Sequence, residues 1–161
     1  MDQFQKFVAT CAAMTAPLVA GAQPVALQGG WVADFSPSMM ETANRSTTVF
    51  QFQGSYKMSQ ANAADVYFLT SCVGMEAATK MQDGGTDTKG AGRCELKDKD
   101  GDMLLAAMET AFDGFKLKIE GGTGKWSGAS GRIVSKETFT AETERQLKGF
   151  SNASGNLEIK K

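Results

Sequence analysis

The chain has 161 residues, with 18 acidic and 17 basic side chains, three cysteines and no histidine. The missing histidine excludes hydrolases with an imidazole base, zinc sites with imidazole ligands and histidine-based pH switches. This length, with 42% hydrophobic residues, predicts one folded domain. A net charge of −1 provides no basic patch, so we expect no nucleic-acid partner.

The first 22 residues have the composition of an export signal. Residues 7–20 are apolar or small, and Ala20-Gly21-Ala22 has the small-x-small form of a signal-peptidase site. The run is too short to span a bilayer core of about 30 Å. We therefore predict a signal peptide over 1–22, one barrel domain over 23–161, a periplasmic or secreted location, and no membrane attachment after cleavage. The alternative is an ordered N-terminal helix on a cytoplasmic protein.

Short strand signals dominate the rest of the sequence. Residues 50–58 and 115–120 alternate apolar and polar side chains with the period of two of half-buried strands. Residues 66–70 are apolar on both faces, as in a strand covered on both sides. With these three, the predicted strands are 26–35, 94–97, 102–109, 132–140 and 156–160. The count predicts an all-β fold of about eight antiparallel strands, as a closed barrel or a sandwich.

The segments between these strands are rich in turn residues. Asp100-Gly101 predicts a tight hairpin that leads into 102–109, so we expect a strand there although its residues are good helix formers. Residues 82–92 contain four glycines and predict an exposed loop. Residues 142–147 allow a turn of helix in the last connection.

Two cysteines remain in the predicted mature chain. Cys11 leaves with the signal peptide, and the even pair Cys72 and Cys94 has a spacing suited to one disulfide. Two buried free thiols are the alternative. Without a CxxC pair or a histidine, these cysteines cannot complete a zinc site, so we expect no metal.

Two motifs resemble cofactor loops but have the wrong spacing. In residues 121–131 the glycines do not fall where a phosphate-binding loop or a dinucleotide fingerprint needs them. Residues 98–102 are acidic, but their glycine is at the fourth position, whereas a calcium loop needs it at the sixth. We interpret the first as a sharp turn or bulge and the second as a hairpin tip, and we expect no cofactor.

The same two segments carry a family resemblance. Residues 94–103 (CELKDKDGDM) and 121–131 (GGTGKWSGASG) resemble the C-terminal half of bacterial proteins grouped with the allene oxide cyclase and dirigent barrels. The resemblance implies an eight-stranded antiparallel barrel of the calycin type with an apolar cavity, often assembled as a homo-oligomer. Plant members of the group steer reactive intermediates by holding them in a shaped pocket. No catalytic residue can be aligned onto this chain.

Such a barrel has room for one small ligand. The large aromatic residues that could shape its pocket are Trp31, Phe50, Phe52, Tyr56, Tyr67 and Trp126. Three functions follow: a binding protein for a small apolar or aromatic molecule, a cyclase or isomerase acting by confinement, or a structural protein with a filled barrel. Catalysis would need a carboxylate of raised pKa in the cavity, for which Glu109 is the candidate because it ends an apolar run.

Overall fold

In a computed structural model, the chain folds into a β-barrel. The structure describes residues 21–61, 63–111, 113–143 and 145–160. The signal peptide predicted over 1–22 therefore lies almost entirely outside the described residues. The part of the chain that is described contains no helix long and apolar enough to cross a bilayer.

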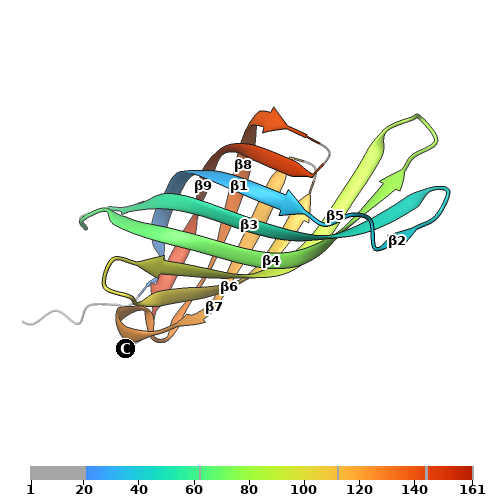
Figure 1. The fold of residues 1–161 in the computed structure, drawn as a ribbon. Coiled ribbons are helices and arrows are strands. Elements are labelled where there is room, and N and C mark those ends of the chain that lie inside the picture. Colours follow the sequence, from blue (N-terminus) through green and yellow to red (C-terminus); the bar gives the residue numbers. More distant parts are fainter. Residues whose placement is uncertain (1–20, 62, 112, 144, 161) are drawn as a thin grey trace, which may run out of the picture.

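The described residues form nine antiparallel strands and one 3-10 turn (Figure 1). The strands follow the order β1-β9-β8-β7-β6-β5-β4-β3-β2, and β1 also pairs with β3, which closes eight of them into a barrel with β2 added outside. This confirms the predicted all-β barrel. The elements are β1 (Gln23–Phe35), β2 (Met40–Glu41), β3 (Arg45–Gln60), β4 (Val66–Lys80), β5 (Thr86–Asp98), β6 (Met103–Ala111), β7 (Gly114–Gly122), η1 (Gly124–Trp126), β8 (Ala129–Glu142) and β9 (Gln146–Ile159).

Alternation along each strand sends one set of side chains into the barrel. The pattern predicted for 50–58 holds in β3, where the even positions are buried apart from Gly54, which is half-buried. It also holds in β6, so the run of helix formers at 102–109 is a strand, as the preceding turn predicted. The largest fully buried side chains come from many strands and include Leu27, Tyr56, Met58, Phe68, Leu96, Leu104, Ile133 and Leu157.

Strand β4 differs from its prediction. Its 66–70 segment was expected to be covered on both faces, but Tyr67 and Leu69 are 63% and 71% exposed on the outside of the barrel. Only one face of a single-layered barrel wall is covered, so an apolar outer face remains in contact with solvent. The strand also continues to Lys80, ten residues beyond the predicted end.

The loop predicted over 82–92 is mostly strand. β5 begins at Thr86, and its first residues pair with the end of β4, which leaves a connection of residues 81–85. Gly92, one of the glycines that suggested a loop, and Gly74 of β4 make room for close approaches between neighbouring strands. A Cβ atom on Gly74 would lie 2.5 Å from the Phe50 ring, and one on Gly92 would lie 2.6 Å from the Val73 carbonyl oxygen.

The turn of helix predicted over 142–147 is also wrong. β8 ends at Glu142 and β9 begins at Gln146, and the backbone amide of Thr143 donates to the Gln146 carbonyl across the hairpin.

The glycine-rich 121–131 segment is a sharp turn, as predicted. It contains η1 and two glycines in the left-handed region, Gly124 (φ +51°) and Gly128 (φ +74°).

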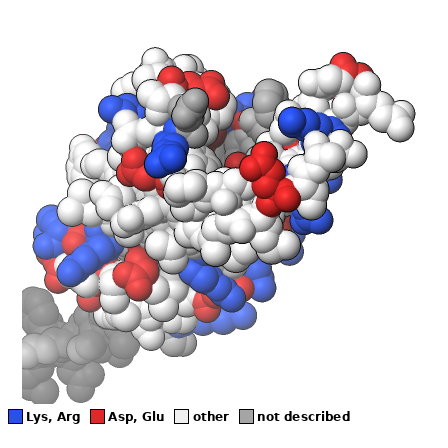
Figure 2. Space-filling model, turned by 45° about the vertical axis from the view of Figure 1, so that its right-hand side comes forward, with Lys and Arg blue, Asp and Glu red and all other residues white. Residues whose placement is uncertain are grey.

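The two ends of the barrel differ. At one end η1 places Trp126 against Phe68, with ring centroids 5.5 Å apart, which closes the interior. At the other end the β4–β5 hairpin and the β2–β3 segment project beyond the barrel wall (Figure 1). Figure 2 shows acidic and basic side chains interspersed over the face toward these projections, with no continuous patch of one sign.

Candidate functional site

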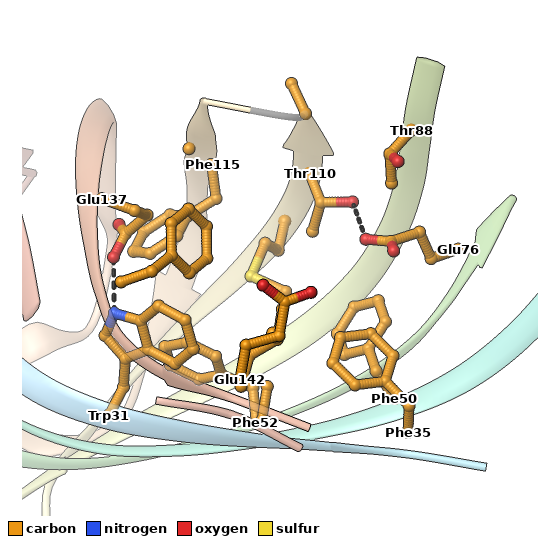
Figure 3. Close-up of a pocket in the computed structure, with 16 residues that line it drawn as sticks. Trp31, Phe35, Phe50, Phe52, Glu76, Thr88, Thr110, Phe115, Glu137 and Glu142 are labelled. Atoms are coloured by element: carbon orange, nitrogen blue, oxygen red, sulfur yellow. Dashed lines mark hydrogen bonds between the residues drawn. The ribbon is translucent and has the colours of Figure 1, made fainter. Parts of the chain in front are cut away.

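The barrel interior opens into a cavity at the end that carries the projecting hairpins (Figure 3). Its volume is about 400 Å³, within the range of small-molecule sites. All the closed strands contribute, through Trp31, Ala33, Phe35, Phe50, Phe52, Glu76, Thr88, Met108, Thr110, Ala111, Gly114, Phe115, Glu137, Phe139, Glu142 and Leu147. The inward-facing side chains near this end of the barrel line the wall and leave the centre unfilled.

Aromatic rings form much of the cavity wall. Trp31 of β1 stacks on Phe52 of β3 with ring centroids 5.3 Å apart, and Phe115 of β7 meets the same Phe52 edge-on at 5.9 Å. Phe35 and Phe50 form a second pair at 6.3 Å nearer the mouth. These rings contact one another, so their packing fixes the cavity wall without a ligand.

Glu137 of β8 is the most constrained polar group in the cavity. The Trp31 indole and the Ser151 hydroxyl both donate to Glu137 Oε2, the latter at 2.8 Å, while the Ser135 hydroxyl donates to Oε1. Three donors from three strands therefore hold this carboxylate in one position (Figure 3 shows the Trp31 contact). Its orientation in turn fixes the plane of the Trp31 ring.

Tyr56 lies below the cavity and extends this network. Its hydroxyl is 2.9 Å from Ser151 Oγ, and because the single Ser151 proton is directed to Glu137, Tyr56 is the donor. Burial raises the pKa of Tyr56 above its usual range, the Ser151 hydrogen bond opposes the shift, and the Glu137 charge adds to it. Tyr56 is therefore a permanent hydrogen-bond donor beneath the cavity.

Glu76 of β4 projects into the cavity from the opposite wall. Its Oε2 accepts a hydrogen bond from the Thr110 hydroxyl at 3.2 Å (Figure 3). Burial raises the pKa of Glu76, and the Thr110 hydrogen bond only partly opposes the shift. Glu142 provides a third carboxylate at the exposed rim.

The structure divides the residues predicted to bind a ligand. Trp31, Phe50 and Phe52 line the cavity together, and Tyr56 lies beneath them. Trp126 is buried at the opposite end of the barrel, where its indole donates to Asp98. Tyr67 is on the outer surface.

Glu109, the carboxylate considered for catalysis, points away from the interior. It is exposed on the outer face of β6, in register with Lys116 of β7. The neighbouring positions Met108 and Thr110 face inward and line the cavity. Glu76 is the carboxylate that combines a place in the cavity with a raised pKa.

Sequence reasoning missed several lining residues. Phe115 shares the apolar face of the predicted 115–120 strand, and Glu137 and Phe139 share the inward face of 132–140, so alternation could have indicated them. Glu76 had no such signal because β4 was predicted to end at residue 70. Among the described residues, no group of three or more side chains from Cys, Asp and Glu is placed to hold a metal ion.

Comparisons with known proteins identify no family for this chain. No family model and no curated protein matches it. Among solved structures it is similar to a pterocarpan synthase dirigent protein, with 14% sequence identity and a TM-score of 0.49 over 98% of this chain and 100% of that chain. A likeness at this level carries no conclusion about activity or substrate.

Proposed function

We propose that this protein binds a small apolar or aromatic molecule in the open end of its barrel, without covalent chemistry. The observation that carries the proposal is the cavity of about 400 Å³ walled by six aromatic side chains. Burial of apolar ligand surface against such walls would supply the affinity. The polar groups held around Glu137 would orient the ligand.

The two alternative functions make different demands on the same interior. A structural protein with a filled barrel has no use for an open cavity, so the cavity favours binding. A cyclase or isomerase acting by confinement would use Glu76 as the carboxylate of raised pKa. Binding needs only the cavity and its walls, so it is the function proposed.

We also propose that the protein works outside the cytoplasm. Cys72 and Cys94 form a disulfide between β4 and β5, and such bonds persist mainly in oxidising compartments. The disulfide is compatible with export to the periplasm or the medium. Together with the signal peptide predicted over 1–22, it supports an extracytoplasmic role.

Blocking the mouth tests the binding proposal. Thr88 faces the cavity from β5, so Thr88→Trp would place an indole in the ligand space. We expect the Kd of N-phenyl-1-naphthylamine, an uncharged aromatic fluorophore, to rise at least about tenfold by fluorescence titration. We also expect the probe to be recovered chemically unchanged.

The matched control is Lys89→Trp, which adds the same ring one residue further along β5 on the exposed outer face. It should leave the probe's Kd within about twofold of wild type. Equal Kd values for wild type and both variants would show that the probe binds outside the cavity, which would contradict the proposal.

A further inference from the structure

The cavity carries negative charge without an internal counter-charge. Its 16 lining residues include Glu76, Glu137 and Glu142, and among the described residues no lysine or arginine lines it. Buried carboxylates are usually paired with a cation or held by several donors. The three carboxylates of this cavity differ in how many hydrogen-bond donors the protein supplies to them. This difference indicates which of them would interact with a charged ligand.

Glu137 already has its donors within the protein. The Trp31, Ser135 and Ser151 side chains supply three hydrogen bonds to its two oxygens. Within the described part of the chain, Glu76 accepts a side-chain hydrogen bond only from the Thr110 hydroxyl, and the exposed Glu142 lies at the rim. The carboxylates left to interact with a ligand are therefore Glu76 and Glu142, which enter the cavity from β4 and β8 (Figure 3).

Aromatic faces accompany these two carboxylates. Figure 3 shows the rings of Phe35 and Phe50 beside Glu76, and all three side chains line the same cavity. An aromatic face attracts a cation through its quadrupole, and the attraction grows where water is excluded. Carboxylates and ring faces together form the usual surroundings of a bound organic ammonium group. An anionic ligand would meet repulsion from Glu76 and Glu142 and no compensating cation.

We propose that the ligand is an organic cation, a protonated or quaternary amine attached to an apolar or aromatic body. The ammonium group would lie between Glu76, Glu142 and the Phe35–Phe50 pair, with the body against Trp31 and Phe52. This inference rests on the binding function proposed above and names the class of molecule bound. It accounts for a cavity whose described lining residues include three acidic side chains and no basic ones among apolar walls.

Three probes of similar size and different charge test the inference by isothermal titration calorimetry. They are benzyltrimethylammonium, benzyl alcohol and phenylacetate, each titrated into the wild-type protein at low ionic strength. We expect the cation to bind at least about tenfold more tightly than the alcohol, and the anion to bind most weakly. An alcohol that binds as tightly as the cation, or an anion that binds most tightly, would overturn the inference.

The charge of the two carboxylates is tested with the double variant Glu76→Gln, Glu142→Gln. It should weaken benzyltrimethylammonium about tenfold and leave benzyl alcohol nearly unchanged. Glu95→Gln is the control, since it removes one charge from the exposed outer face of β5. It should change neither Kd. If Glu95→Gln weakens the cation as much as the double variant does, the attraction comes from the whole surface and not from the cavity.

The two proposals fail in different ways. If the neutral fluorophore binds and Thr88→Trp blocks it, but the three probes show no preference for the cation, the inference fails and the binding function stands. If neither the fluorophore nor any of the three probes binds, both fail. Should the double variant not fold, the order of affinities among the three probes on the wild-type protein decides the inference.

Discussion

Asp98 keeps its charge although its side chain has no exposed surface at the closed end of the barrel. Lys125 Nζ lies 2.9 Å from Asp98 Oδ2, and the Trp126 indole donates to the same oxygen at 2.8 Å. The backbone amides of Asp100 and Asp102 donate to Oδ1. Burial would raise the pKa of Asp98, but the Lys125 and Trp126 hydrogen bonds and the Asp100 amide together lower it to about 2.

The free energy of unfolding should therefore decrease in acid as Asp98 becomes protonated. The folded-state pKa lies below the unfolded value of about 3.9, so the charge stabilises the fold above that pH, and this contribution is lost as the pH falls toward 2. We expect Asp98→Asn to lower the free energy of unfolding by about 2 kcal/mol at pH 7. Urea unfolding at several pH values should show the difference from wild type shrinking below pH about 4.

Asp87→Asn is the control for loss of an aspartate charge. Asp87 pairs with Lys89 on the surface, where the Lys89 side chain is 78% exposed and that of Asp87 is 44% exposed, and such pairs contribute little. Its unfolding free energy should stay within about 0.5 kcal/mol of wild type at pH 7. A gap between Asp98→Asn and wild type that stays constant down to pH 2 would contradict the charge-based account.

At the residue scale, the site could be predicted only where the sequence shows whether a side chain points into the barrel or out of it. Where the sequence showed clean alternation, as at Phe50 and Phe52, the inward residues were identified correctly. Glu109 is a candidate for catalysis in the sequence because it ends an apolar run. The strand continues beyond it, however, and the alternation of side chains along β6 places Glu109 on the outer face. Composition names residues able to shape a pocket, whereas only register says which side of the wall they occupy.

At the scale of the strands, one disulfide links β4 to β5. Cys72 and Cys94 are direct partners in the antiparallel register, and both side chains are buried inside the barrel. This settles the two readings of the cysteine pair in favour of a cross-link. The bond closes a segment 22 residues long that contains the projecting β4–β5 hairpin, so it fixes the base of that hairpin near the cavity.

Reduction of this disulfide should destabilise the whole barrel. A loop of 22 residues corresponds to about 3 kcal/mol in the chain-entropy model. We expect a reducing agent to lower the urea midpoint of the wild-type protein correspondingly, with reduction verified by mass spectrometry. The double variant Cys72→Ala, Cys94→Ala should show no response to the reductant. An unchanged midpoint for fully reduced wild-type protein would contradict this prediction.

The existence of strands was more predictable than their length. All eight predicted segments lie wholly or mainly in strands of the barrel, because alternation and hairpin turns are local signals. The first half of β5 was missed because its glycines at 90 and 92 resemble loop residues. They are needed where the backbones and the Phe50 ring approach closely, which is a tertiary constraint that no local pattern reveals.

At the scale of the whole molecule, the barrel separates stability from binding. The closed end is filled by Trp126, Phe68 and the aliphatic side chains around them, and is anchored by the Asp98 cluster. The open end leaves its centre empty and exposes the carboxylates of Glu76 and Glu142 to it. A barrel can keep an empty mouth because its strands are hydrogen-bonded around a closed circle and its other half supplies a packed core.

This separation predicts opposite effects for truncating one aromatic side chain at each end. Trp126→Ala should lower the free energy of unfolding by about 3–5 kcal/mol and leave the Kd of N-phenyl-1-naphthylamine for the folded protein nearly unchanged. Phe35→Ala should cost only about 1–2 kcal/mol, because Phe35 is half-buried at the mouth, and should weaken the same probe severalfold. Urea unfolding and fluorescence titration of both variants measure the two effects. Equal losses of stability, or a probe that Trp126→Ala weakens as strongly as Phe35→Ala does, would show that the two ends act as one packed unit.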